Sequence, residues 1–153
     1  MSIEIEKKFI IENVPFPLDS YNFVEITQGY ISVEEGFSEV RVRAIDKKYI
    51  LTIKSNKQNF RLEEECLLDI SQGQRLLDFC KNRTIKKTRY FIPYNNLIIE
   101  LDIFKEKLKG LKIAEVEFNS IYAIDNFKVP LWFGQDVTND ERYKNKNLAI
   151  YGL

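Results

Sequence analysis

The sequence predicts a mainly β fold with a few peripheral helices (α+β), in which eight antiparallel strands form a closed barrel with a charged lumen. Eight runs rich in β-branched and aromatic residues follow one another with short connections, and charged and aliphatic residues alternate within most of them. Only six glycines and four prolines interrupt the 153 residues. Runs of this kind are typical of an up-and-down sheet that closes on itself.

The eight expected strands are defined by their β-branched and aromatic content and by turn-forming residues between them. They are Ser2–Ile11, Phe23–Val33, Ser38–Asp46, Lys48–Ser55, Phe60–Asp69, Lys86–Ile92, Leu97–Lys105 and Lys112–Phe118.

Helices are expected at three places. Ser71–Lys81 interrupts the β pattern, because its apolar residues recur at helical spacing and Ser71 is suited to cap the first turn. Ser120–Phe127 is expected to form a second short helix, and Glu141–Tyr151 one or two more. No shift in composition marks a boundary, so residues 1–153 are expected to form a single domain.

The composition excludes several classes of protein. With 44% apolar and 30% charged residues, the chain is typical neither of a disordered nor of a membrane protein. Its apolar runs are shorter than the roughly 20 residues that a spanning helix needs. The first residues, MSIEIEKKF, include two acidic side chains where a secretory signal would be basic and then apolar. A cytoplasmic location is therefore expected.

The overall charge gives a first indication about partners. Lys plus Arg number 23 and Asp plus Glu number 23, so the formal net charge is zero. A general nucleic-acid binder needs a basic excess, so a small-molecule ligand is expected rather than a nucleic acid or a membrane. The chain is expected to be a monomer or a homodimer.

The residue types also limit the chemistry. Histidine is missing and only two cysteines occur, which excludes Ser-His-Asp and Cys-His nucleophiles, HExxH zinc sites and a tetrahedral cysteine site. A metal ion in this protein would need oxygen ligands, as Mg²⁺, Mn²⁺ and Ca²⁺ prefer.

Charged side chains recur at alternate positions in seven of the eight expected strands. Residues i and i+2 of a strand share a face, so each group lies on one face with aliphatic residues on the other. For a single strand, a solvated face is the simpler explanation, but the recurrence across the sheet is harder to explain that way. The groups are Glu4, Glu6 and Lys8; Arg41 and Arg43; Thr52 and Lys54; Arg61, Glu63 and Glu65; Lys87 and Arg89; Glu100 and Asp102; and Glu115 and Glu117.

The aliphatic faces must be covered, and if helices and loops cover them from outside, the charged faces line the lumen. Buried ions need partners, which interleaved acidic and basic groups provide in part. Lys and Arg suit phosphate oxygens, and clustered carboxylates suit hard divalent cations. A complex of a metal ion with a polyphosphate satisfies both sets at once.

A series of short motifs extends over nearly the whole chain, beginning with an ExExK motif, Glu4-Ile5-Glu6-Lys7-Lys8. In order, the others are Gln28-Gly29-Tyr30, Arg41-Val42-Arg43, Leu51-Thr52-Ile53-Lys54, Arg61-Leu62-Glu63-Glu64-Glu65, Lys87-Thr88-Arg89-Tyr90, Glu100-Leu101-Asp102, Ala114-Glu115-Val116-Glu117-Phe118, Asp136-Val137-Thr138 and Arg142-Tyr143-Lys144-Asn145. With this series the chain resembles the CYTH superfamily, also called triphosphate tunnel metalloenzymes, and in particular its short bacterial triphosphatase branch. The resemblance implies an eight-stranded antiparallel tunnel that hydrolyses a terminal phosphoanhydride with Mg²⁺ or Mn²⁺. It further implies that tripolyphosphate is the preferred substrate and that nucleoside triphosphates are weaker ones.

The charged groups then receive expected roles. The metal ligands are expected to be Glu4, Glu6, Glu115 and Glu117, with Glu63, Glu65, Glu100 and Asp102 as supporting carboxylates. The phosphate-binding residues are expected to be Arg41, Arg43, Lys54, Arg61, Lys87 and Arg89. The resemblance implies that Lys8 and Tyr30 form a catalytic dyad that orients or activates the water. Activation by the metal is the competing account, and Tyr30 as a packing aromatic is the alternative for that residue.

Two other functions remain open at the level of sequence. A class IV-type adenylyl cyclase would share the architecture but needs contacts for adenine and ribose, which the sequence does not reveal. A non-catalytic polyphosphate- or nucleotide-binding module would need fewer carboxylates. The aromatic residues Trp132, Phe133 and Tyr143 are expected to pack in the core or close the tunnel rather than to bind ligand.

Overall fold

The strands form a single antiparallel sheet. The computed structural model describes residues 5–34, 36–55 and 62–153, and within these residues the sheet has eight strands. They are β1 Ile5–Ile10, β2 Asn22–Ser32, β3 Glu39–Ile45, β4 Lys48–Lys54, β5 Glu63–Leu68, β6 Thr84–Tyr94, β7 Leu97–Phe104 and β8 Lys112–Phe118.

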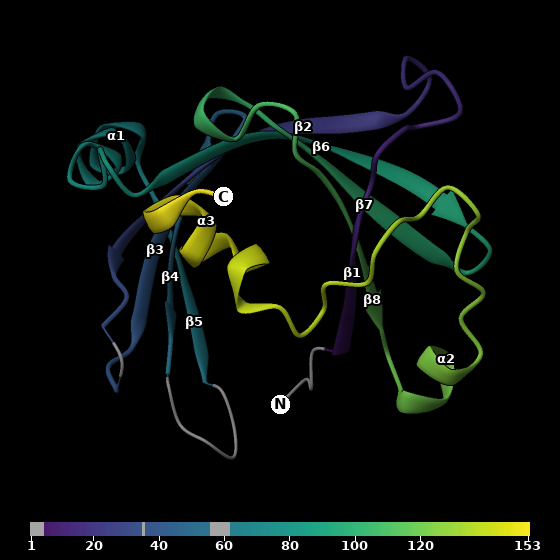
Figure 1. Ribbon diagram of the computed structural model, residues 1–153. Helices are drawn as coiled ribbons and strands as arrows, with labels where there is room; N and C mark the ends of the chain where they lie inside the picture. Colours follow the sequence, from purple (N-terminus) through teal and green to yellow (C-terminus); the bar gives the residue numbers. More distant parts are fainter. Residues whose placement is uncertain (1–4, 35, 56–61) are drawn as a thin grey trace.

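The sheet curves into an arch around a central space (Figure 1). Its strand order is β1-β8-β7-β6-β2-β3-β4-β5, so β1 pairs with β8 and β2 with β6 in place of the simple up-and-down order that we expected. The eight antiparallel strands and the charged interior agree with the predicted barrel, but hydrogen bonds between the described residues do not close it. The outer edge of β1 is instead used by the C-terminal segment: Ile10 N donates to Gln135 O at 2.9 Å, and Val137 N donates to Lys8 O at 2.8 Å.

The aliphatic faces of β1, β6, β7 and β8 point outward and form the larger core. Phe9, Leu101 and Val116 are buried there, beneath side chains from the segments 14–21 and 123–133. The Phe133 ring packs against Phe9 with centroids 4.9 Å apart. The outside of this half of the sheet is therefore apolar and covered, which leaves its other face for the charged residues.

Helix α1 (Ile70–Asp78) covers the outer face near β3 and β4. It packs closely enough that a Cβ atom on Gly73 would lie 2.2 Å from the Tyr49 ring. The prediction that Ser71 caps this helix is wrong. Asp69 caps the helix, because its carboxylate accepts from Gln72 N at 2.7 Å while the Gln72 side chain accepts from Asp69 N at 3.1 Å. This reciprocal capping box is a stronger start signal than a single serine.

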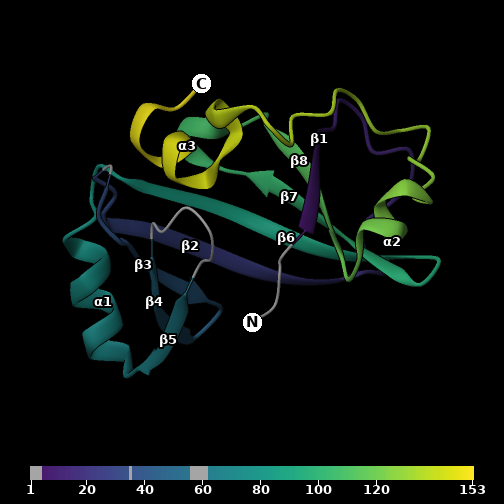
Figure 2. The same ribbon diagram turned by 90° about the horizontal axis from the view of Figure 1, so that it is seen from below.

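The remaining helices are short. Ser120 caps helix α2 (Ile121–Asp125), which lies within the expected helix Ser120–Phe127, and 3₁₀ turns occupy Glu106–Leu108 and Glu141–Tyr143. Helix α3 (Asn145–Tyr151) lies on the concave side of the arch (Figures 1 and 2). None of the helices in the described part of the chain is long and apolar enough to cross a membrane.

Helix α3 fills one part of the concave side with apolar residues. Leu148 and Ala149 are fully buried against Tyr30, Ile85 and Phe104. The C-terminal segment thus forms a second, smaller core inside the arch. The rest of the concave face retains the charged side chains of the strands.

Candidate active site

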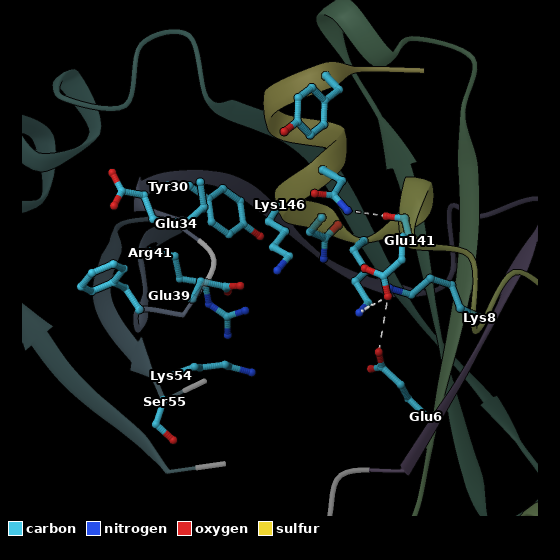
Figure 3. A pocket seen from close by; sticks show the side chains of 16 residues that line it. Glu6, Lys8, Tyr30, Glu34, Glu39, Arg41, Lys54, Ser55, Glu141 and Lys146 are labelled. Atoms are coloured by element: carbon cyan, nitrogen blue, oxygen red, sulfur yellow. Dashed lines mark hydrogen bonds and ion pairs between the residues drawn. The ribbon is translucent and has the colours of Figure 1, made fainter. Parts of the chain in front are cut away.

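The concave face encloses two adjoining cavities, which we call the inner and the outer cavity. The inner cavity has a volume of about 280 Å³ and the outer cavity about 710 Å³. Five residues line both: Glu6, Lys8, Arg41, Lys54 and Asn145. Figure 3 shows the outer cavity, with Tyr30, Arg41 and Lys54 facing Glu6 and Lys8 across it.

The inner cavity brings together most of the residues that the alternation singled out. Of the predicted site residues it is lined by Glu6, Lys8, Arg41, Arg43, Lys54, Glu63, Glu65, Lys87, Arg89, Glu115 and Glu117. Tyr30 lines the outer cavity. Glu100 and Asp102 are not among the described residues that line either cavity, and they contact Arg89 instead. Glu4 and Arg61 lie outside the described residues.

Arg89 holds the carboxylates of β7 and β8 together. Its Nε and Nη2 donate to the two oxygens of Asp102, each at 2.7 Å, and Nη2 also donates to Glu115 Oε2 at 3.0 Å. Its Nη1 pairs with Glu100, and Lys87 Nζ pairs with Asp102, which is fully buried. Burial lowers the pKa of Lys87, and the charge of Asp102 opposes that change. The bidentate geometry is a strong one, so Asp102 anchors both cations.

Glu115 is a buried carboxylate surrounded by cations. Its Oε1 lies 3.1 Å from Lys8 Nζ, which in turn lies 3.9 Å from Glu6 Oε1. Burial acts to raise the pKa of Glu115, but the charges of Lys87, Lys8 and Arg89 outweigh it and lower the pKa to about 2. Glu115 is therefore ionised throughout the neutral range.

Carboxylates also face one another in this wall. Glu6 and Glu117 are directly opposite in the β1–β8 pairing, and Glu100 is opposite Glu115 in the β7–β8 pairing. Burial raises the pKa of Glu100; Arg89 opposes the rise, and the charges of Glu115, Asp102 and Glu117 add to it. Like charges opposite each other destabilise a sheet, so additional positive charge would stabilise this wall.

The facing wall, formed by β2, β3 and β4, is rich in cations. Arg41 Nη2 is 3.9 Å from Glu63 Oε1, and Lys54 Nζ is 3.0 Å from Glu63 Oε2. Burial lowers the pKa of Arg43, and the charges of Arg41 and Arg89 lower it further. Arg41 Nε is buried without a hydrogen-bond partner in the described part of the structure. An unpaired buried donor destabilises a structure, so a ligand atom that accepts a hydrogen bond from Arg41 Nε would stabilise this wall.

Tyr30 contacts Gln28 rather than Lys8 in the hydrogen bonds that the structure describes. Its hydroxyl accepts from Gln28 Nε2 at 2.5 Å, and Gln28 Oε1 accepts from Arg43 Nε at 2.9 Å. Burial raises the pKa of Tyr30, and the charge of Glu39 adds to the rise. The described ion pairs of the Lys8 ammonium are with Glu6 and Glu115. The dyad of Lys8 and Tyr30 therefore stays a prediction, with the two side chains on opposite sides of the outer cavity (Figure 3).

Comparison with known families identifies the fold. The model of the CYTH domain matches residues 2–147. The chain belongs to the CYTH family.

Relatives and solved structures agree with this assignment. This CYTH chain is 39% identical over 149 residues to a protein of Nitrosomonas europaea named inorganic triphosphatase, covering 96% of this chain and 97% of the relative. It is 37% identical over 155 residues to a protein of Acetivibrio thermocellus with the same name, covering 97% and 94%. The crystal structure of an inorganic triphosphatase aligns with a TM-score of 0.78 and 37% identity, covering 98% of this chain and 96% of the other.

The CYTH site contains residues that were not predicted as site residues. Gln28 is two positions before Tyr30 in β2, and the alternation used for the charged groups would have found it if neutral amides had been included. Asn145 and Lys146 come from the start of α3, and Lys146 points into the outer cavity (Figure 3). Tyr143 was expected to pack in the core or close the tunnel, but nothing in the local pattern of residues 144–151 indicates that α3 lies inside the arch.

Proposed function

We propose that this CYTH chain is a metal-dependent triphosphatase that hydrolyses the terminal phosphoanhydride of triphosphates. We propose inorganic tripolyphosphate as the preferred substrate and Mg²⁺ or Mn²⁺ as the metal. The observation that carries the proposal is the inner cavity, with carboxylates on one wall and, on the other, a buried arginine donor that has no partner among the described residues. Two relatives that match nearly the whole chain and are named inorganic triphosphatase support it.

The cations of the β2–β4 wall would bind the phosphate chain. Arg41 Nε has no acceptor among the described residues, and a phosphate oxygen would provide one. Arg43 lies in an excess of positive charge that an anionic ligand would relieve. Lys54 would add a point charge from the next strand. Phosphoryl transfer depends mainly on positioning and electrostatic stabilisation, so these groups need not exchange protons.

The carboxylates of the β1–β8 wall fit a divalent cation in donor type. Glu6, Glu115 and Glu117 line one cavity and offer only oxygen ligands, as Mg²⁺ and Mn²⁺ prefer. No three such groups among the described residues are already close enough to hold an ion, and Glu4, the fourth expected ligand, lies outside them. A bound cation would neutralise phosphate oxygens and make a bound water more acidic.

Lys8 would orient the reacting groups between the two walls. Its ammonium contacts Glu115 and Glu6, and an ammonium donates hydrogen bonds but accepts none. We therefore propose that Lys8 holds a water or a phosphoryl oxygen in place. Lys8→Ala should lower kcat by about a hundredfold or more, as loss of a positioned donor does in other sites. An unchanged kcat would dismiss this role.

The whole site draws on strands from both ends of the chain, so we propose that residues 1–153 act as one domain. Both β1 and β8 contribute to the inner cavity, together with β2–β6.

A substrate and metal panel tests the proposal. Tripolyphosphate, long-chain polyphosphate, ATP, GTP and thiamine triphosphate would each be incubated with Mg²⁺ or Mn²⁺, with release of phosphate as the readout. We expect tripolyphosphate to give the highest rate and a chelator to abolish it. Cyclic AMP formed from ATP would instead indicate an adenylyl cyclase. Tight binding of tripolyphosphate without metal-stimulated phosphate release would indicate a binding module.

A further inference from the structure

Gln28 is a neutral amide buried within a charged site. It lies on β2 with 1% of its surface exposed and shares a face with Tyr30, two residues further along. In the sheet it is directly opposite Arg43, while Tyr30 is opposite Arg41. A buried amide must satisfy both its oxygen and its nitrogen, so the direction of each of its hydrogen bonds is informative.

Arg43 fixes the orientation of the amide. A guanidinium only donates, so the atom that faces Arg43 Nε at 2.9 Å must be the oxygen of Gln28. The amide nitrogen then faces Tyr30 and donates to its hydroxyl oxygen at 2.5 Å. The Tyr30 oxygen is thus an acceptor in this pair, and its own hydrogen must point elsewhere.

The hydrogen of the Tyr30 hydroxyl has no acceptor in the described hydrogen bonds. In the described part of the structure, this hydroxyl accepts a hydrogen bond from Gln28, and Tyr30 lines the outer cavity. We propose that Gln28 is a positioning residue, which directs the Tyr30 hydroxyl hydrogen toward an oxygen of the bound phosphate chain and holds Arg43 toward the inner cavity. This inference rests on the proposed function, because the ligand is taken to be a triphosphate.

The environment of Tyr30 agrees with a role as a donor. Burial raises its pKa, so the hydroxyl keeps its hydrogen in the neutral range. A phenol in this state donates a hydrogen bond and does not remove a proton from water. In the proposed arrangement Tyr30 contacts the ligand, and Gln28 acts through it.

A double-mutant cycle tests this arrangement with Gln28→Glu and Tyr30→Phe. A carboxylate at position 28 would still accept from Arg43 but would also accept from Tyr30, which turns the hydroxyl hydrogen away from the ligand. We expect each single variant to lower kcat/KM for tripolyphosphate by about tenfold to a hundredfold, the range for a hydrogen bond to a charged group. Gln28→Glu should then lower kcat/KM by a smaller factor in the Tyr30→Phe background than alone, because the hydroxyl is already missing and only the effect of the added carboxylate remains.

Gln28→Met is the control for the added charge, since it keeps the volume and introduces no carboxylate. Gln28→Met should also lower kcat/KM by a smaller factor in the Tyr30→Phe background than alone. Some loss of kcat/KM remains in that background, because Arg43 is no longer held. If either Gln28 variant lowers kcat/KM by the same factor in both backgrounds, Gln28 does not act through Tyr30 and the inference is overturned. An unchanged kcat/KM in Tyr30→Phe overturns it as well.

The wild-type protein separates this inference from the proposed function. If it hydrolyses no tripolyphosphate, the triphosphatase proposal fails. The same cycle can then be measured as Kd for tripolyphosphate by calorimetry, with the same pattern expected.

Discussion

The buried carboxylate of Glu115 gives a prediction that links acid stability to the active site. Burial alone would raise its pKa, but Lys87, Lys8 and Arg89 outweigh burial and lower the pKa from its ordinary value of 4.5 to about 2. A carboxyl whose pKa is lower in the folded state stabilises the fold above its unfolded pKa. That contribution is lost as the pH falls from about 4.5 toward about 2.

The magnitude follows from the two pKa values. One pKa unit corresponds to about 1.4 kcal/mol, so ionisation of Glu115 contributes about 3 kcal/mol near pH 7. At pH 2.5 most of this is lost and about 1 kcal/mol remains. Gln resembles the protonated carboxyl, so the stability difference between the wild type and Glu115→Gln should shrink by about 2 kcal/mol between pH 6 and pH 2.5.

Urea unfolding at a series of pH values, in metal-free buffer, measures this difference. Glu12→Gln is the matched control, because Glu12 is exposed and the variant should differ little from the wild type at every pH. A constant difference between the wild type and Glu115→Gln from pH 6 to pH 2.5 would refute the reasoning. It would mean that Lys8, Lys87 and Arg89 do not hold Glu115 in its ionised form.

Three further predictions concern single positions. Arg41→Lys removes the buried Nε and the planar guanidinium, so kcat/KM for tripolyphosphate should fall by about tenfold or more in steady-state assays. A kcat/KM equal to that of the wild type would argue against phosphate binding by Arg41. Lys146→Ala should raise KM about two- to fivefold with kcat unchanged, an effect that should weaken in high salt because Lys146 lines the open outer cavity. Gly29→Ala would place a Cβ atom 2.5 Å from Cys80 Cβ, so urea unfolding should show a loss of about 1–3 kcal/mol, and unchanged stability would contradict this close packing.

Strand positions were largely predictable because alternation is a local signal. The expected strand Lys112–Phe118 coincides with β8, in which charged and apolar residues alternate from Ala114 to Phe118. Strand β6 extends over Thr84–Tyr94, beyond the expected Lys86–Ile92, because its ends continue the pairing with β2 and β7. The end of a strand is set by its neighbours in the sheet, which the strand's own sequence does not specify.

Long-range placement was harder to predict. The bridge between Phe9 and Asp136 joins segments at opposite ends of the chain, and no periodicity marks either segment for the other. This pairing occupies the edge of β1 that a closed barrel would have used. Similarly, the sequence indicates that charges share a concave face, but the pairing of Arg89 with Asp102 and Glu115 depends on the register of β6, β7 and β8.

The two walls of the inner cavity differ in how far their charges are already matched. Among strands β6, β7 and β8, Arg89 is bound by three carboxylates, so its substitution should mainly reduce stability. On the β2–β4 wall, Arg43 donates to the neutral amide of Gln28, and the buried Nε of Arg41 has no described partner. These cations gain the most from an anionic ligand, so their substitution should mainly reduce affinity. From the polarity of the cavity we therefore propose that the phosphate chain binds against β2 and β3, with a divalent cation toward β1 and β8.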